Sequence, residues 1–331
     1  MPDGPRPPAV RSAAGPAPRS AGPVIGPAGP PPSEGAAAGE RSRTGERPPA
    51  DRQVVDVHYH AGPDLYRRRL TAAGAGRAYA GIDGWVAVKS HLGSTAASAW
   101  EARQEGLPVS GAVVLNELAG GVRTRVVEQA VYAHGPDSPA RLLVHLPTHI
   151  GPAHPSPLHR APFHPLLDLE RWRGPRILDG TGRLARPVRE VLRAARDLPV
   201  VLATGHCDRE ETLRVADEAA RLDVPRLLLT HATHPMSGLT PADLAGLADL
   251  PGLYVELTAL MLLLGHRSPG HLAELVRAHP RIVFSSDLGQ PDQPDPAGWL
   301  VRNTEWFRAA GLTGTQVRAV TRLNPAALLA P

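Results

Sequence analysis

Short apolar runs alternate with longer amphipathic stretches from Val54 to the end of the chain. Several runs are apolar at every position, which is typical of parallel strands buried on both faces. The pattern predicts eight strands, at residues 54–60, 85–88, 109–115, 141–146, 200–203, 226–230, 253–257 and 281–284. It predicts helices between and after them, at residues 70–80, 94–104, 121–134, 187–196, 209–221, 241–248, 268–278, 297–310 and 315–329.

Eight strands that alternate with helices predict an α/β fold, a (β/α)₈ TIM barrel. The stretch from Gln53 to Pro331 has about the length of one such barrel, typically about 250 residues. A doubly wound open sheet is the alternative. The absence of a Gly-x-Gly-x-x-Gly sequence after the first strand argues against its dinucleotide-binding form.

The first fifty residues have a different composition. They are mostly Pro, Gly, Ala, Ser and Arg and contain almost no large apolar side chains. Such a stretch cannot bury enough surface to offset the entropy lost on ordering. We therefore expect a disordered tail at residues 1–50, without the apolar segment of a secretory signal, and a barrel domain at residues 51–331.

Composition and charge limit the partners that we expect. The longest apolar run, residues 259–264, is far shorter than the roughly 18 residues of a membrane span. Part of the formal charge of +4 belongs to the tail, and the body has no dense basic stripe that would bind nucleic acid. The lone Cys207 excludes an intrachain disulfide and fits a cytoplasmic location. We expect a small-molecule substrate and neither a nucleic acid nor a membrane partner; a homo-oligomer is left open.

The end of the first strand carries His58 and His60. Because side chains alternate along a strand, both imidazoles point the same way. Two imidazoles so placed can bind one divalent metal ion. Taken alone, the pair could equally be two surface histidines in a turn.

Further histidines and a carboxylate follow other strands. His206 follows the fifth strand, His231 the sixth and Asp287 the eighth. In a barrel, the carboxyl ends of the strands share one face, where the chemistry takes place. Four histidines and one aspartate at matched positions form a ligand set that suits zinc or a similar divalent ion.

This order of ligands resembles the amidohydrolase superfamily of metal-dependent hydrolases. That superfamily places His-x-His on strand one, a histidine on each of strands five and six, and an aspartate on strand eight. The C-terminal residues 322–329 also resemble the closing Asn-Pro-Ala-x-Leu-Leu helix of many members. The resemblance implies one or two divalent ions, zinc by expectation, bound by His58, His60, His206, His231 and Asp287. It further implies that Asp287 transfers protons and that His231 holds a substrate oxygen or a second metal.

One position departs from this pattern. Binuclear members carry a carboxylated lysine or a glutamate on strand four, whereas strand four here ends in His145, which we interpret as a core or rim residue. Lys89, the only lysine of the chain, ends strand two. A buried lysine can lose its proton and form a carbamate, which arginine cannot do. We interpret Lys89 either as the missing metal bridge or as a catalytic cation that contacts substrate.

Substrate contacts are expected from two places. His91 follows Lys89 by two residues and points to the same side of the strand. The Pro- and His-rich stretch 147–167, which includes His149 and His154, could bind metal, but a substrate lid is the interpretation that we prefer. Glu256, within strand seven, is expected to be a buried, hydrogen-bonded core residue.

Together these features predict a metal-dependent hydrolase that activates water for attack on an amide, lactone, ester or phosphoester bond. A metal-dependent non-oxidative decarboxylase of the same superfamily is one alternative. A catalytically inert metal-binding barrel with a binding role is another.

Overall fold

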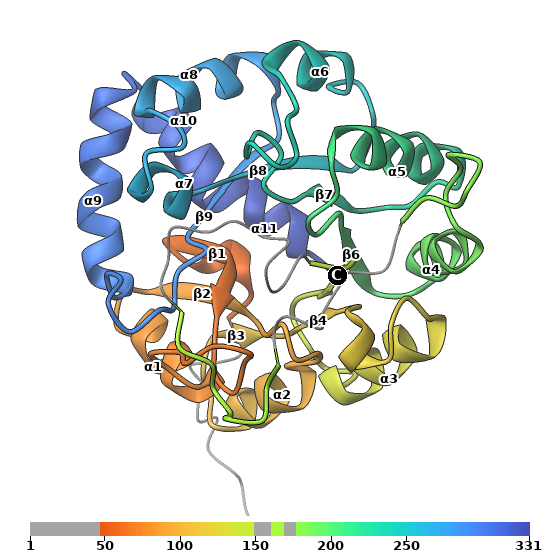
Figure 1. Cartoon of the computed structure of the whole chain (residues 1–331). Coiled ribbons are helices and arrows are strands. Elements are labelled where there is room, and N and C mark those ends of the chain that lie inside the picture. The colour runs from red at the N-terminus through yellow and green to blue at the C-terminus, as the bar shows by residue number, and fades with distance from the viewer. Residues whose placement is uncertain (1–46, 149–159, 169–176) are drawn as a thin grey trace, which may run out of the picture. The chain divides into compact units, whose positions relative to one another are not determined.

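The computed structural model describes residues 47–148, 160–168 and 177–331 (Figure 1). Residues 1–46, most of the predicted tail, lie outside the described residues. His149 and His154 lie outside them as well. The strands are β1 (Val54–His60), β2 (Gly84–Lys89), β3 (Val109–Ser110), β4 (Ala112–Val114), β5 (Leu142–His145), β6 (Val200–Ala203), β7 (Leu227–Leu229), β8 (Leu253–Thr258) and β9 (Ile282–Ser285).

The helices lie between the strands and after the last of them. The α-helices are α1 (Ala72–Ala80), α2 (Ala96–Gln104), α3 (Thr124–His134), α4 (Arg186–Asp197), α5 (Arg209–Arg221), α6 (Pro241–Gly246), α7 (Ala259–Leu263), α8 (Pro269–Ala278), α9 (Pro296–Ala309), α10 (Gly314–Arg318) and α11 (Asn324–Leu329). Three short elements complete the description: η1 (Pro49–Asp51), η2 (Glu117–Ala119) and the π-helical η5 (Ala319–Leu323). The predicted last helix, 315–329, is thus one run made of α10, η5 and α11.

All strand pairs are parallel, and the strands follow one another in chain order. One sheet is β1-β2-β3 and the other runs from β4 to β9. The end of β9 returns to β1, because Tyr59 and Leu288 form a parallel bridge and the Asp287 N–H donates to the His58 carbonyl over 2.7 Å. Strands inside and helices outside (Figure 1) confirm the predicted α/β barrel class.

Gly111 divides the predicted strand 109–115 into β3 and β4. Its N–H donates to Nε2 of His134 over 3.1 Å instead of to a neighbouring strand. A Cβ at this position would lie 2.8 Å from the Cα of Ala96, at the start of α2. The strand bends here because α2 packs directly against its backbone.

The interior of the barrel is apolar. One buried cluster takes a residue from every strand except β3, and α11 contributes Ala326, Leu328 and Leu329 to it. A second, larger cluster lies between the strands and the outer helices. The C-terminal helix therefore covers one end of the barrel, and the carboxyl ends of the strands form the other.

A β-bulge in β1 decides which way the histidines point. Val55 and Val57 belong to the interior cluster and Tyr59 to the outer one. Strict alternation would have placed Tyr59 inside and His58 outside. Between Asp56 and Tyr59, however, β1 has one residue more than β2. The extra residue turns His58 and His60 toward the interior, as bulges near active sites commonly do.

Asp56 holds this bulge in place. Its Oδ1 accepts hydrogen bonds from the N–H groups of His58 and Ser286, each over 3.0 Å. The hydroxyl of Tyr79 donates to its Oδ2. Burial raises the pKa of Asp56 to about 6, while the bonds from Ser286 and Tyr79 act in the opposite direction. Asp56 thus ties the bulge of β1 to the end of β9.

The described chain begins to pack before the expected domain boundary. Pro49 is buried, and Arg47 forms an ion pair with Asp83 over 2.5 Å. In the residues that the structure describes, no helix is long and apolar enough to cross a membrane.

Candidate metal centre

Polar side chains from the carboxyl ends of the strands meet on one face of the barrel. The loop after β9 supplies Asp287, whose Oδ1 lies 3.1 Å from Nε2 of His60 and 3.3 Å from Nε2 of His58. Its Oδ2 lies 3.8 Å from Nε2 of His231, which follows β7. Three imidazoles from two distant parts of the sequence thus face one carboxylate.

Two of these residues have an unusual backbone conformation. His231 and Asp287 have φ angles of +50° and +52°, in the left-handed region that residues other than glycine seldom adopt. The N–H of His231 donates to Oε2 of Glu256 over 3.1 Å, and that of Asp287 to the carbonyl of His58. These bonds hold both residues in a strained turn, and such strain clusters at functional sites.

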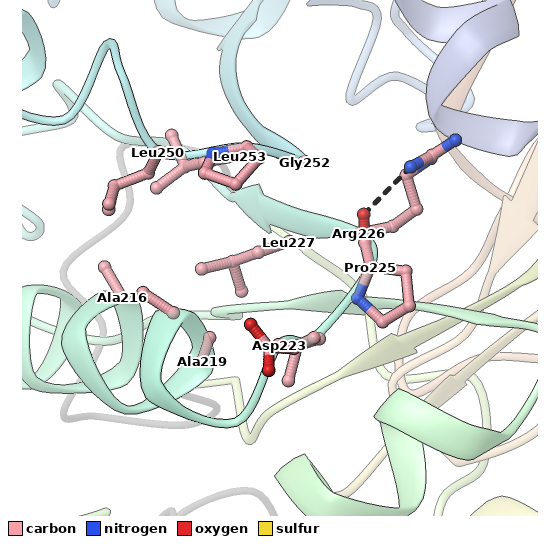
Figure 2. A pocket seen from close by; sticks show the side chains of 12 residues that line it. Ala216, Ala219, Asp223, Pro225, Arg226, Leu227, Leu250, Gly252 and Leu253 are labelled. Atoms are coloured by element: carbon pink, nitrogen blue, oxygen red, sulfur yellow. Dashed lines mark hydrogen bonds between the residues drawn. The ribbon is translucent and has the colours of Figure 1, made fainter.

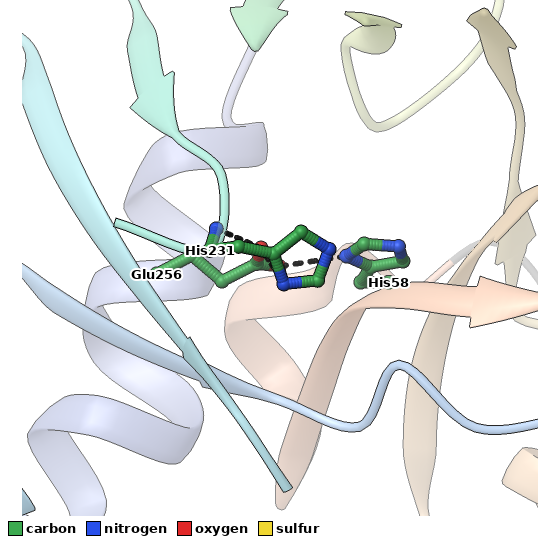
Figure 3. Close-up of side chains that lie close together, drawn as sticks. All are labelled: His58, His231 and Glu256. Carbon is green, nitrogen blue, oxygen red and sulfur yellow. Dashed lines mark hydrogen bonds and ion pairs between the residues drawn. The ribbon is translucent and has the colours of Figure 1, made fainter. Parts of the chain in front are cut away.

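Glu256, on β8, lies directly behind the histidines (Figure 3). Its Oε1 accepts from Nδ1 of His58 over 3.0 Å and from Oγ of Ser285 over 2.6 Å. Because a carboxylate only accepts, His58 carries its proton on Nδ1 and directs the Nε2 lone pair toward Asp287. The sequence indicated a buried, hydrogen-bonded residue here but not this orienting contact.

Lys89, at the end of β2, lies within the same group. Its Nζ is 3.0 Å from Nε2 of His58, and the residue is 1% exposed. Burial lowers the pKa of Lys89 to about 8, although Asp287 and Glu256 act against this shift. Burial likewise raises the pKa of Asp287 to about 7, with the Lys89 charge opposing it. Both groups therefore titrate close to neutral pH.

Three sets of side chains in the described residues could bind a metal ion: His58 with His60 and Asp287, His58 with His231 and Glu256, and His60 with Asp64 and His91. In the second set, Glu256 already accepts three hydrogen bonds. In the third, Arg68 lies 2.6 Å from Oδ2 of Asp64 and would repel a cation.

The first set has its ligand atoms directed toward one point. Both Nε2 atoms face Asp287, and His231 adjoins it. Imidazole and carboxylate ligands are those that zinc and similar divalent ions take. A divalent cation therefore fits best between His58, His60 and Asp287.

His206 lies on the loop after β6, with its ring centroid 5.4 Å from that of His231. Gly205 brings it there, since its φ is +63° and a Cβ would lie 2.1 Å from the carbonyl oxygen of Leu146. His206 is close to the histidine group, but it belongs to none of the three candidate sets.

His91 stacks on His60, with ring centroids 4.7 Å apart. Its Nδ1 lies 2.9 Å from Oγ1 of Thr148, and its N–H donates to Asp64. The predicted substrate contact is thus part of the wall beside His60.

His145 is the last residue of β5, the strand end at which the sequence resemblance led us to look for a bridging lysine or glutamate. It is 1% exposed, and its ring lies 5.8 Å from that of His58. Neither ring nitrogen has a hydrogen-bond partner among the residues described. Burial, with Lys89 and His58 adding to it, keeps its pKa well below the usual histidine value. A neutral histidine, and no carboxylate, therefore stands at this strand end.

A separate cavity lies at the opposite end of two strands (Figure 2). It has a volume of about 260 Å³ and lies where β7 and β8 begin, beside Leu227 and Leu253. Its lining is mostly alanine, proline and leucine, with Asp223 and Arg226 at its edge. None of the candidate metal ligands lines it.

Several solved structures are similar to this chain. The 2,6-dihydroxybenzoate decarboxylase from Rhizobium has 12% identity and a TM-score of 0.47, and the match covers 84% of this chain and 98% of that one. The organophosphorus hydrolase from Deinococcus radiodurans has 15% identity and a TM-score of 0.43, with 85% and 93% covered. A dipeptidase described as a metallopeptidase has 19% identity and a TM-score of 0.41, with 71% and 67% covered.

Comparison of sequences gives a family rather than an activity. No curated protein matches the chain. The model of a family of unknown function, DUF6282, matches residues 53–256, which span the barrel from just before β1 into β8. This match covers more than half of the sequence and includes His58, His60, Lys89 and His231. The chain therefore belongs to the DUF6282 family.

Proposed function

We propose that this protein is a metal-dependent hydrolase of the amidohydrolase type. The observation that carries the proposal is that Nε2 of His58 and Nε2 of His60, at the start of the barrel sequence, lie 3.3 and 3.1 Å from Oδ1 of Asp287, near its end. Buried imidazoles gathered around a carboxylate at the carboxyl ends of barrel strands suit a metal site better than a structural core.

His58, His60 and Asp287 would hold the ion, with His231 beside them. When bound, a divalent ion supplies a Lewis acid that acidifies water and polarises a carbonyl or phosphoryl oxygen. Zinc is the ion that we propose, because two imidazoles and one carboxylate are a common ligand set of catalytic zinc, with a coordination position left for water.

Asp287 is the group that we propose to move the proton. Its carboxyl group faces the three histidines. A carboxylate in this position would accept a proton from the attacking water and return it to the leaving group, as a general base does. Glu256 keeps His58 in the tautomer that the ion requires.

His231 and Lys89 would act on the substrate. Nε2 of His231 lies 3.8 Å from Asp287, on the side of the carboxylate away from His60. From there it would donate to the oxygen that gains charge during attack. Lys89 would add a positive charge next to His58, or bridge a second ion as a carbamate.

Non-oxidative decarboxylation is the second candidate. The specific observation in its favour is His145 at the end of β5, because that position offers no carboxylate to bridge two ions. One ion rather than two is what this alternative requires.

The test begins with the full-length protein loaded with zinc. Bound metal is measured by mass spectrometry, and turnover is followed on esters, lactones, amides, phosphotriesters and aromatic carboxylic acids. We expect one to two ions per chain and hydrolysis of at least one substrate class. The double variant His58→Ala, His60→Ala should lose both the ion and the activity, whereas Arg186→Ala, at an exposed site on α4, should keep both.

Two results would overturn the proposal. One is full metal retention in the double variant. The other is a metal-loaded protein that hydrolyses nothing but releases CO₂ from a carboxylic acid, since that would establish the decarboxylase instead.

A further inference from the structure

We propose that the substrate of this site carries an oxyanion, a carboxylate or a phosphate, which Arg68 and Arg160 bind beside the metal centre. The inference rests on the proposed function, because it names the class of substrate that the same site takes. The observation that supports it is that two guanidinium groups, one from the loop after β1 and one from the loop after β5, both lie near the ring of Tyr66.

Arg68 is a buried cation at the edge of the site. Its side chain is 2% exposed, and both Nε and Nη2 lie 2.6 Å from the same oxygen, Oδ2 of Asp64. Nη2 forms no well-directed hydrogen bond within the described part of the chain. One carboxylate oxygen thus serves two guanidinium nitrogens, which leaves hydrogen-bonding capacity on the guanidinium for a further acceptor.

Asp64 is a carboxylate that several other donors share. Its Oδ1 accepts from the N–H groups of Leu65 and His91, over 2.7 and 2.6 Å, and from the hydroxyl of Ser90 over 3.3 Å. Its negative charge is therefore spread over several donors. Arg68 is held in place by Asp64, while a second oxyanion could still bind to it.

Arg160 comes from a different loop and reaches the same place. Its guanidinium lies 5.2 Å from the centre of the Tyr66 ring, and that of Arg68 lies 5.9 Å from the same ring. The backbone fixes this arrangement, because the N–H of Arg67 donates to the carbonyl of Ala161 and that of Phe163 to the carbonyl of Leu65. Two parts of the chain nearly a hundred residues apart thus present two arginines around one aromatic ring.

Both charges act on the metal centre. Arg68 and Arg160 each lower the pKa of Asp287, although burial, the largest effect, raises it. Both also add to the effect of burial in lowering the pKa of His60. The geometry places Arg68 beside the centre as well, because Oδ2 of Asp64, its ion-pair partner, lies 3.5 Å from Nδ1 of His60.

The two guanidinium groups favour a negative substrate. Nη2 of Arg68 can take a further acceptor, and Arg160 lies beside the same tyrosine ring. A guanidinium group binds a carboxylate or a phosphate through charge-assisted hydrogen bonds, which are stronger than those to a neutral ester.

The experiment uses the full-length, zinc-loaded protein and three probes: benzoate, inorganic phosphate and the neutral benzamide. Their dissociation constants are measured by isothermal titration calorimetry. The variants are Arg160→Gln and the pair Asp64→Asn, Arg68→Gln, which removes the ion pair as a unit. Arg186→Gln, at an exposed site on α4, is the matched control. Metal content is measured for every sample.

We expect each site variant to weaken benzoate or phosphate by about tenfold or more, the usual loss for a charge-assisted hydrogen bond. Metal content and benzamide binding of Arg160→Gln should stay as in the wild type, and Arg186→Gln should change nothing. The oxyanion with the larger loss identifies the group that the arginines bind.

Equal binding of both anions to the wild type and to both site variants would overturn the inference. So would benzamide that binds as tightly as benzoate. A protein without bound metal, whose anion binding still depends on Arg160, would refute the proposed function and leave this inference standing.

Discussion

Replacing Glu256 by glutamine tests whether this residue sets the chemistry of the metal centre. The change preserves size and removes the charge and one of two acceptor oxygens. Glu256 accepts from three donors in the structure: Nδ1 of His58, Oγ of Ser285 and the N–H of His231. A glutamine has one oxygen and one NH₂ group, so at least one of these donors then faces another donor.

The expected losses follow from this arrangement. One buried donor left without an acceptor costs about 1–3 kcal/mol of folding free energy. If the NH₂ group faces His58, the histidine must take the other tautomer, with its proton on Nε2, and can no longer bind an ion there. Loss of such an orienting contact weakens metal binding by about 10- to 100-fold, or roughly 1.4–2.7 kcal/mol.

The assay combines metal affinity with stability. Zinc affinity is measured by competition with a chromogenic chelator, and the free energy of unfolding by denaturant titration of the metal-free protein. Glu190→Gln is the control, since Glu190 is a partly exposed residue that pairs with Arg186 on α4. Zinc affinity of Glu256→Gln within twofold of the wild type would refute the orienting role, whatever happens to stability.

Other perturbations give further tests. Lys89→Arg should lower turnover by at least about 100-fold, because a guanidinium cannot lose its proton at a site that is 1% exposed; a simultaneous fall in metal content would indicate a bridging carbamate. Deletion through Glu46 should leave the melting temperature and metal content unchanged, whereas deletion through Asp51 removes η1 with its buried Pro49 and should lower the melting temperature. Burial lowers the pKa of His134 from 6.5 to about 3. Between pH 6.5 and pH 3 the unfolded chain therefore binds one proton more than the folded protein, and the free energy of unfolding falls as the pH falls through this range. His134→Gln, whose amide oxygen can still accept from Gly111, should flatten the decline by up to about 1.4 kcal/mol per pH unit in denaturant titrations between pH 6.5 and 4. An unchanged slope would show that His134 is not the group responsible.

The strand and helix pattern was readable from the sequence because each element carries a strong local signal. Buried parallel strands are apolar throughout, as at 200–203, and the helices between them are amphipathic. The break at Gly111 was not predictable in this way. It depends on the approach of Ala96 from a helix whose packing no local pattern encodes.

The sequence predicted which residues form the candidate site, but it did not predict how their side chains are arranged. His58, His60 and Asp287 could be named because each follows an apolar strand. The bulge that turns His58 inward was not visible, since it arises from the register between β1 and β2. Nor was the role of Glu256, because an acidic residue inside a strand looks the same whether it packs in a core or orients a ligand.

The position of the metal ion tests the account most directly. A crystal of the zinc-loaded, full-length protein, measured on both sides of the zinc absorption edge, locates the ion by its anomalous signal. We predict a peak about 2.0–2.2 Å from Nε2 of His58, Nε2 of His60 and an oxygen of Asp287, with Lys89 moved away from the His58 nitrogen or bound to the ion. A peak beside Asp64 and His91, or no peak at Asp287 with Lys89 still 3.0 Å from His58, would contradict the account.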